Sequence, residues 1–396
     1  MKIIFFGLPA HGHTNPTLAV VQRLTAQGHQ VFYYSTQEFQ EKIENTGAVF
    51  IDYAHWMPQP LHAADAARLG NDLAFGIQQL VDITLALDKY LSAEISKLQP
   101  DLIIFDSMAY WGKLAAQKFG IPSVCSTTTF AFNQHSARVM KQGFADILRL
   151  IFSMPKINRS LSRLRSAGFC VNSPLDIIQN ANDTNTIVYT SPEFQPCSQT
   201  FSSHYVFVGP LLREKESAFP KAKGKKRIYI SLGTVNNQLP SFYDACIRAL
   251  RDKPNYEVIL SAGSLLSSLA PLPDNIIAAQ ALDQIAVLES ADVFVTHCGM
   301  NSVSEALFYA VPLVLFPQTP EQRGVANRVL SCGAGILLPS TKPDTILSCI
   351  ETVLNQPDYR ECAKKISQSF HNCGGVDAAV DFIERVARTP VPPYSV

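Results

Sequence analysis

The sequence predicts an α/β protein made of two doubly wound parallel-sheet domains. The chain has 396 residues, more than a single hydrophobic core usually serves. In both halves, short and wholly apolar segments alternate with amphipathic helical segments, a pattern typical of parallel strands covered by helices on both faces. Between the halves, residues 213–226 shift abruptly to charged residues, proline and glycine, which predicts an interdomain linker.

The first domain is expected to span residues 1–212. Its apolar run KIIFF is followed by a Gly/Pro/His loop, the helical segment TLAVVQRLTAQ and a second apolar run, VFYYS. This order is that of a parallel βαβ unit. The same order returns further along, with strands expected at 100–107 and 121–127 and a helix at 110–120.

The second domain is expected to span residues 227–375 and repeats the alternation. Its helices include SFYDACIRALR and VANRVLSCG, and residues 376–396 read as a last amphipathic helix and a Pro-rich tail that packs back on the first domain. Two such domains facing each other across a cleft would place the ligand site in that cleft. Strands are expected within KRIYISLGT, YEVILSAG, NIIAAQ, DVFVTHCG, PLVLFPQ and AGILL.

Composition excludes several classes of function. The formal net charge is zero, so there is no electrostatic case for a nucleic-acid partner. Nine cysteines without paired short spacings fit a reduced chain better than a disulfide framework or a zinc site. The first apolar run is too short for a signal peptide and no segment reaches a membrane-spanning length, so we expect a cytoplasmic protein.

The common nucleotide motifs are absent from the sequence. No first strand is followed by G-x-G-x-x-G, and the P-loop spacing of Gly7 and Gly12 is followed by His13 and Thr14 instead of lysine and a hydroxyl residue. No D-x-D triplet is present to hold a divalent metal against a diphosphate. A diphosphate would therefore have to be neutralised by helix termini, hydroxyl groups and imidazole.

One candidate anion site is the stretch FVTHCGMNSVSEAL, which begins like a buried strand and ends like a helix, with His297 and Gly299 in the bend. Ser302 and Glu305 have the spacing of a capping box, which predicts a helix start beside Asn301. A helix start presents backbone N–H groups and the positive end of the helix dipole to an anion. An ordinary turn with a satisfied histidine remains the alternative.

Two other stretches follow expected strands of the second domain. SLGT places Ser231, Gly233 and Thr234 where hydroxyl groups and close backbone can reach a phosphate, and FPQTPEQ places Glu321 and Gln322 where acceptors suit sugar hydroxyls. The carboxyl ends of parallel strands form the binding edge of such sheets, so these stretches should gather there.

The segment THCGMNSVSEALFYAVPLVLFPQTPEQRGVANRVLSCGAG resembles the donor-binding signature of the UDP-dependent glycosyltransferases. PAHGHTNPTLAVV resembles the G-H-x-N-P start of their bacterial macrolide-type branch, and the likeness follows nearly the whole chain in order. The resemblance implies a metal-independent, inverting transfer from a nucleotide-activated sugar to a small acceptor, on the two-domain GT-B fold. It implies no cofactor besides the UDP-sugar co-substrate. The contacts it implies are His297 with the diphosphate, Asn301 and Ser302 with the phosphates, Glu305 with the ribose, and Glu321 and Gln322 with the sugar.

One part of the signature departs from the family. The family usually carries W-x-P-Q before the signature helix, where this sequence has Ala281, Leu282, Asp283 and Gln284. The aromatic plate that stacks on uracil is therefore missing, and such stacking is worth about 1–3 kcal/mol per base. Gln284 is still expected to face the base, and a dTDP-sugar donor stays open beside a UDP-sugar.

The catalytic candidates are His13 and Asp106. Imidazole can take a proton from an acceptor hydroxyl near neutral pH, and a carboxylate behind the ring would orient it. His11 lies in the same loop, and the family pattern favours His13 as the base. Asp106 ends an expected strand and could instead cap a helix. A zinc site made of His11, His13 and Asp106 is a further alternative, although the neighbouring residues Pro9, Gly12 and Pro16 offer no ligand. Cys298 is expected to fill space and not to act as a nucleophile.

The acceptor is expected to bind an apolar pocket of the first domain. Trp56, Met57, Phe130 and Phe132 lie in loops after strands, although ordinary core packing would also explain each of them. An apolar pocket favours a flavonoid, phenolic, macrolide or sterol acceptor. Residues 141–165 combine helical apolar spacing with several arginines and lysines, so they could cover this pocket as a lid or touch an anionic membrane surface weakly.

The sequence therefore predicts a hexosyltransferase that uses a UDP-sugar, with glucose as the expected sugar. Two other functions fit the same architecture. A nucleotide-sugar 2-epimerase would need no acceptor, and a sensor would bind the nucleotide sugar without turning it over.

Overall fold

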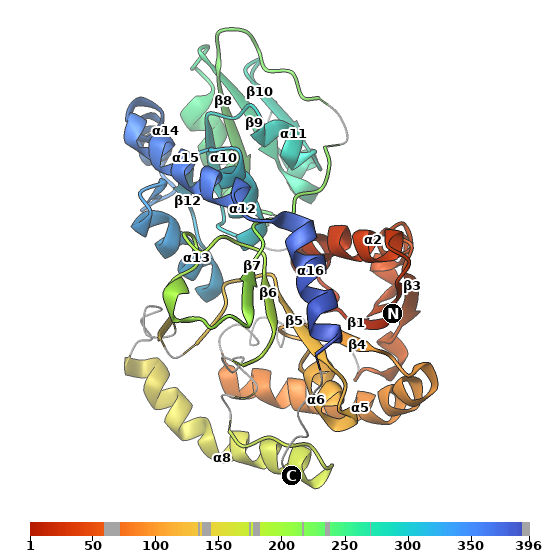
Figure 1. The fold of residues 1–396 in the computed structure, drawn as a ribbon. Helices are drawn as coiled ribbons and strands as arrows, with labels where there is room; N and C mark the ends of the chain where they lie inside the picture. Colours follow the sequence, from red (N-terminus) through yellow and green to blue (C-terminus); the bar gives the residue numbers. More distant parts are fainter. Residues whose placement is uncertain are drawn as a thin grey trace. The chain divides into compact units, whose positions relative to one another are not determined.

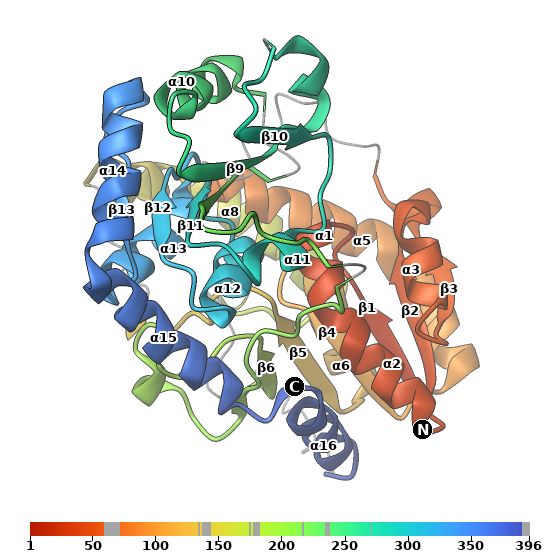
Figure 2. The ribbon, with the colours of Figure 1, turned by 90° about the horizontal axis from the view of Figure 1, so that it is seen from above.

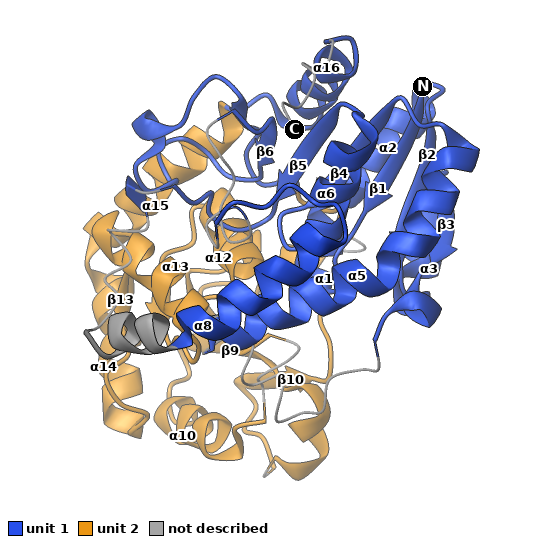
Figure 3. Cartoon of the chain, turned by 90° about the horizontal axis from the view of Figure 1, so that it is seen from below, with its two compact units in different colours: residues 1–211, 373–396 blue, residues 212–372 orange. Residues whose placement is uncertain are grey.

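The computed structural model describes residues 1–58, 72–133, 135–136, 144–173, 176, 183–215, 218–233, 238–269 and 271–389. The chain divides into two compact units (Figure 3). Unit 1 consists of Met1–Leu211 and Cys373–Val396, and unit 2 consists of Leu212–Asn372. Each unit has its own parallel sheet.

Unit 1 is built on a seven-stranded parallel sheet with the order β3-β2-β1-β4-β5-β6-β7. The strand order reverses between β1 and β4, and the loops after such a pair of strands diverge to leave a binding crevice. Figure 2 shows β1, β4 and β5 as neighbours in this sheet. The strands are β1 (Lys2–Phe6), β2 (Gln30–Ser35), β3 (Val49–Asp52), β4 (Leu102–Asp106), β5 (Ser123–Thr127), β6 (Thr186–Val188) and β7 (Tyr205–Phe207).

Helices cover both faces of this sheet, which explains why its strands are mainly apolar. Ile3 and Phe5 of β1 pack in a cluster with helices α2 (Leu18–Ala26) and α16 (Gly375–Ala387). The alternate residues of β1 pack on the other face against α5 (Leu73–Leu98) and α6 (Tyr110–Phe119). Helix α16, which follows unit 2 in the sequence, lies beside α2 (Figure 1). The remaining α-helices of the described part of unit 1 are α1 (His11–Thr14), α3 (Gln40–Glu44) and α8 (Phe144–Ser166).

Unit 2 is built on a six-stranded parallel sheet with the order β10-β9-β8-β11-β12-β13. The order again reverses between two central strands, β8 and β11. The strands are β8 (Lys226–Ser231), β9 (Tyr256–Ser261), β10 (Ile276–Ala279), β11 (Val293–Thr296), β12 (Leu313–Leu315) and β13 (Gly335–Leu337). The helices are α10 (Pro240–Leu250), α11 (Gln284–Leu288), α12 (Met300–Phe308), α13 (Pro320–Ser331), α14 (Pro343–Asn355) and α15 (Pro357–His371).

The core of unit 2 lies between its sheet and two neighbouring helices, α10 and α14. Ile228 and Ile230 of β8 face these helices, while Tyr229 points to the opposite face and stacks on Phe294 of β11 with ring centroids 4.7 Å apart. The strands and helices expected from apolar periodicity in both halves are therefore confirmed.

The segment 213–226, expected to be a linker, belongs to unit 2. Its described residues form no helix or strand before Lys226, where β8 begins. Arg227, which is fully buried, donates to the carbonyl oxygens of Phe219 and Pro220 at 2.8 and 2.6 Å and to the Glu257 carboxylate at 2.6 Å. These contacts fix the end of the segment against β8 and β9.

Candidate active site

His13 and Asp106 meet at the carboxyl edge of the unit 1 sheet. His13 lies in α1, just after β1, and Asp106 is the last residue of the neighbouring strand β4. His13 Nδ1 lies 2.8 Å from Asp106 Oδ2, and the carboxylate is 1% exposed. A charge-assisted hydrogen bond of this length fixes both the ring orientation and the tautomer.

The second oxygen of Asp106 is also bound. Asp106 Oδ1 accepts the backbone N–H of Met108 at 2.8 Å. Helix α6 begins at Tyr110 with Ala109 as its N-cap residue, so Asp106 does not cap that helix. The helix-cap alternative for Asp106 is therefore wrong, and its carboxylate is held by a turn on one side and by His13 on the other.

Thr128, which follows the next strand, β5, is a third member of this group. Its Oγ1 lies 3.2 Å from His13 Nδ1, and the residue is buried. Sequence reasoning did not single it out. The available signal was its position directly after a buried strand, at the same sheet edge as the other two residues.

His11 points elsewhere, although it shares α1 with His13. Its Nε2 lies 3.0 Å from Glu38 Oε1, and its ring packs on Phe39 with an edge-on geometry. The two histidines therefore pair with different carboxylates. Among the residues that the structure describes, no group of three or more His, Cys, Asp or Glu side chains is arranged to hold a metal ion.

His297 occupies the bend between β11 and α12 in unit 2. Burial lowers the pKa of its imidazole to about 4, and the Ser231 backbone offsets this shift only in part. The ring is therefore neutral at physiological pH and carries one N–H. Its Nδ1 is buried and has no hydrogen-bond partner among the described residues. A buried polar atom without a partner is costly, which is expected where a ligand completes the site.

Two glycines make room for the His297 ring. A Cβ atom on Gly233 would lie 2.6 Å from His297 Cε1, and one on Gly299 would lie 2.6 Å from His297 Nε2. Gly233 also has a φ of +76°, which disfavours any other residue. The loops after β8 and β11 therefore hold the imidazole between two positions at which a Cβ atom would collide with the ring.

Cys298 is next to His297 but is chemically inert. The residue is fully buried, and burial raises the pKa of its thiol to about 12. The thiolate is the nucleophilic form, so this cysteine cannot act as a nucleophile near neutral pH. It fills space beneath the bend, as expected.

The expected capping box at Ser302 and Glu305 is wrong. Helix α12 begins at Met300 with Gly299 as its N-cap residue, and no side chain caps it. Ser302 Oγ instead accepts from Gln284 Nε2 at 3.2 Å, and the Glu305 carboxylate accepts from the same nitrogen. Because α12 begins at Met300, its first backbone N–H groups lie directly after the bend that contains His297.

Gln284 connects several expected donor-binding residues. Besides donating to Ser302 and Glu305, its Oε1 accepts from the Tyr229 hydroxyl at 3.1 Å. Burial raises the pKa of Glu305, while the Gln284 hydrogen bond and the positive charge of Arg213 lower it in part. The amide expected to face a nucleobase is engaged by protein groups in this structure.

The other donor-binding candidates follow β8 and β12. Ser231 is buried, and its Oγ accepts the Gly233 backbone N–H at 3.2 Å.

Gln322 forms the capping box that α13 uses, because the Thr319 hydroxyl accepts its N–H at 3.3 Å and Gln322 Oε1 accepts the N–H of Thr319. Glu321 is exposed in the first turn of α13, and Asn301 lies in the first turn of α12. Thr234 lies outside the described residues.

The acceptor candidates separate into buried and half-buried residues. Phe130 is buried and packs on Phe194 with ring centroids 5.5 Å apart, which favours core packing, while Phe132 is half-buried.

Trp56 is half-buried and stacks on Tyr90 with centroids 5.1 Å apart and planes within 3°. Met57 packs beside Trp56 on the same core cluster. Tyr90 is 43% exposed and was not anticipated, because it lies on a long helix and not in a loop.

The segment 141–165 coincides largely with α8, whose side chains are described from Ser153 onwards. In the described part of α8, Ile157, Leu161 and Leu164 are buried with α5 and α6 in one cluster, and α8 runs along α5 (Figure 3). Arg163 pairs with Asp82 at 2.5 Å. The described apolar face of α8 therefore packs inside unit 1. No helix in the described part of the chain is long and apolar enough to cross a bilayer.

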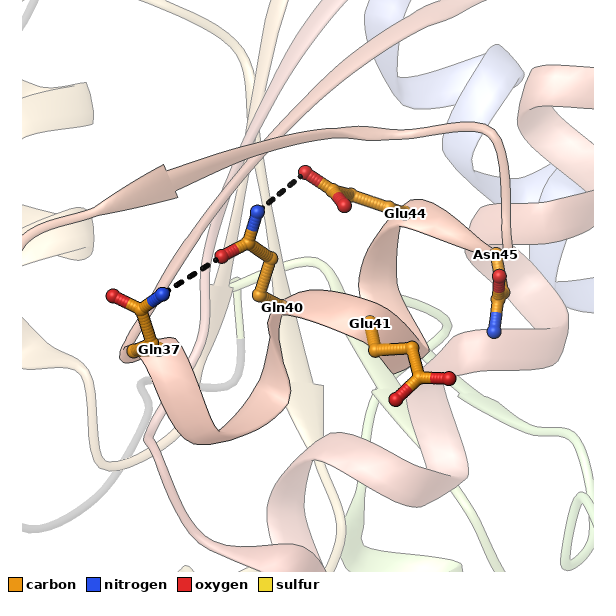
Figure 4. A pocket seen from close by; sticks show the side chains of 5 residues that line it. All are labelled: Gln37, Gln40, Glu41, Glu44 and Asn45. Carbon is orange, nitrogen blue, oxygen red and sulfur yellow. Dashed lines mark hydrogen bonds between the residues drawn. The ribbon is translucent and has the colours of Figure 1, made fainter.

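A surface pocket beside α3 is unrelated to these groups. Figure 4 shows its polar lining, in which Gln37 donates to Gln40 at 3.2 Å and Gln40 donates to Glu44 at 2.9 Å. Glu41 and Asn45 complete the lining, and no site residue expected from the sequence takes part.

Comparison with known proteins identifies relatives over the whole chain. The family described as the C-terminal domain of erythromycin biosynthesis protein CIII-like proteins matches residues 252–372. An NDP-glycosyltransferase YjiC from Bacillus licheniformis is 34% identical, with 96% of each chain covered. An oleandomycin glycosyltransferase from Streptomyces antibioticus is 27% identical, over 96% of this chain and 90% of its own.

Solved structures show the same architecture. The calicheamicin glycosyltransferase CalG4 superposes with a TM-score of 0.81 at 27% identity and 99% coverage of both chains. The glycotransferase of kitacinnamycin gives a TM-score of 0.83 at 25% identity, covering 97% of this chain and 98% of its own. The two units, each with a parallel sheet, match the GT-B fold of these structures. The relatives over the whole chain show that the protein is a glycosyltransferase. Within that class, the chain belongs to the bacterial macrolide-type branch of the UDP-dependent glycosyltransferases.

Proposed function

We propose that this enzyme moves a hexose, in the first place glucose, from a UDP-sugar to a hydroxyl group of a small hydrophobic acceptor, with inversion and without a metal ion. Flavonoids, phenolics, macrolides and sterols are the acceptor classes we infer. The observation that carries the proposal is the 2.8 Å contact between His13 and the buried carboxylate of Asp106. It is the arrangement that a general base for a hydroxyl group requires.

The proton moves from the acceptor to His13. With Nδ1 facing Asp106, the neutral ring carries its proton there and its basic lone pair at Nε2. Nε2 takes the hydroxyl proton while the acceptor oxygen bonds to the anomeric carbon. The bond from that carbon to the diphosphate oxygen breaks, and its electron pair leaves with the diphosphate. Asp106 stabilises the imidazolium that forms, because the carboxylate is shielded from water.

The donor side of the reaction falls to unit 2. The first backbone N–H groups of α12, which no side chain caps, and the neutral imidazole of His297 are suited to hydrogen bond the departing diphosphate. A neutral imidazole donates a hydrogen bond from an N–H that is too weakly acidic to lose its proton to the phosphate. Hydroxyl and amide groups of Ser302, Gln284 and Gln322 extend this set toward the nucleoside and the sugar.

The test is mass spectrometry of reactions that pair several nucleotide sugars with phenolic and macrolide acceptors. The expected product is a hexosylated acceptor with the wild-type enzyme and none with His13→Ala. His11→Ala is the matched control, since His11 lies in the same short helix but pairs with Glu38. Equal turnover in His13→Ala and the wild type would refute the assignment of the base.

Two other outcomes would redirect the assignment of function. Conversion of the sugar in donor alone, without an acceptor, would favour a 2-epimerase. Binding of UDP without turnover of any pair would favour a sensor, although the buried His13–Asp106 contact would then serve no purpose. The names of the relatives, which include an oleandomycin and a zeaxanthin transferase, support a hydrophobic acceptor.

A further inference from the structure

The region around Gln284 and Glu305 contains a positively charged side chain, Arg213, that was not among the residues expected from the sequence. Arg213 lies in the segment that precedes β8, and its Nη2 lies 2.7 Å from Asp283 Oδ1. Asp283 is the N-cap residue of α11, directly before Gln284. The pair therefore places a guanidinium group beside the residues 281–284.

The pair is asymmetric in its exposure. The Asp283 side chain is 8% exposed, whereas the Arg213 side chain is 43% exposed. A nearly buried carboxylate thus orients a planar group that remains accessible to solvent. The plane of an arginine guanidinium stacks on flat π-systems, and this use requires that one face be left uncovered.

Arg213 is also close to the group expected to bind a ribose. Its positive charge acts on the Glu305 carboxylate, which Gln284 in turn holds by a hydrogen bond. Ala281 and Leu282 carry no aromatic ring, and Tyr229 is buried against Phe294. Near the Gln284–Glu305 pair, Arg213 therefore offers a flat, exposed and oriented surface.

We propose that Arg213, positioned by Asp283, is the platform on which the nucleobase of the donor stacks. This inference rests on the proposed function, since it concerns the nucleotide end of the same donor. Stacking on a guanidinium group depends on the π-face that every base has, and not on the pattern of its edge. The enzyme should accordingly distinguish UDP from dTDP weakly.

The experiment compares Arg213→Ala with Lys215→Ala by calorimetric titration. Lys215 pairs with Glu289 at 2.7 Å and is similarly exposed, so Lys215→Ala removes a neighbouring ion pair to the same helix without touching Asp283. Arg213→Ala should lose about 5- to 150-fold in affinity for UDP, and Lys215→Ala should retain the wild-type value. Thermal denaturation of both variants checks that the fold is kept.

Uridine separates a contact with the base from a contact with the phosphates. If Arg213 supports the base, the fold-loss should be the same for uridine and UDP, and Arg213→Lys should lose as much as Arg213→Ala because it keeps the charge without the plane. A loss confined to UDP would overturn the inference in favour of a phosphate contact. Ala281→Trp added to Arg213→Ala should restore affinity for both ligands.

Tyr309 provides the strongest rival platform. It is half-buried at the C-cap of α12, one turn beyond Glu305, and the charges of Glu289, Lys215 and Asp283 act on its hydroxyl. If Tyr309→Ala rather than Arg213→Ala abolishes affinity for uridine, the inference is overturned while the proposed function stands. If the wild-type enzyme binds no nucleoside diphosphate at all, the proposed function fails first.

Discussion

Replacing Gly233 by alanine should disable the diphosphate end of the donor site by moving His297. The new Cβ would lie 2.6 Å from His297 Cε1. The ring has to retreat by about 0.8 Å to reach an ordinary van der Waals contact. A hydrogen bond of about 2.9 Å from His297 to a phosphate oxygen would then exceed the range of such bonds. Hydrogen bonds to charged groups contribute about 1.5–3 kcal/mol, so the affinity for UDP should fall about 10- to 150-fold.

Gly224 provides a matched control for the backbone. Its φ of +75° equals that of Gly233 within a degree, but a Cβ there would have no atom within 4 Å. Both alanine variants should lose about 1–2 kcal/mol of unfolding free energy from the left-handed conformation, measured by urea denaturation. Only Gly233→Ala should also lose UDP affinity in a calorimetric titration. Equal UDP affinities in the two variants would refute the role assigned to the glycine.

Three further predictions concern other parts of the site. His13→Ala should lower the transfer rate about 100- to 10,000-fold and leave the Kd for UDP unchanged, whereas a matching loss of UDP affinity would contradict its role as base. The folded-state pKa of His297, about 4, lies below the ordinary value, so the unfolded chain takes up a proton first as the pH falls. The contribution of His297 to the free energy of unfolding should therefore be intact above pH ~6.5 and decline by up to about 3 kcal/mol toward pH ~4. In urea titrations at several pH values, the free energy of unfolding of His297→Asn should decline less steeply. Finally, the enzyme should not sediment with anionic liposomes at low salt, because the described apolar face of α8 is buried.

Most of the fold was predictable because it follows from periodicity. Strands such as β1 and β4 are apolar at every position except Lys2 at the start of β1 and Asp106 at the end of β4, since helices cover both sides of the sheet, and this leaves a plain signal in the sequence. The carboxyl-edge rule then brings His13 and Asp106 together, although they are 93 positions apart in sequence. Their contact is the one site geometry that sequence reasoning anticipated in its essentials.

What could not be predicted depends on side chains that compete for partners. Ser302 and Glu305 have the spacing of a capping box, but Gln284 comes from another part of the chain and binds both. The same spacing at Thr319 and Gln322 does form a capping box. Local spacing alone cannot tell these cases apart, because the outcome depends on which residue tertiary packing brings near.

The two ends of the proposed donor site therefore differ in how strongly they are determined by local sequence. At the phosphate end, His297 is held by Gly233 and Gly299, and a substitution at either glycine meets the ring directly. At the proposed base end, Ala281 stands where the family usually has an aromatic residue, and Asp283 orients the guanidinium plane of an arginine from a distant segment. These two changes fit together, since the aspartate that precedes Gln284 is the residue that pairs with this arginine. Divergence of nucleotide preference within the family should therefore be sought in the segment before β8 as well as in the signature itself.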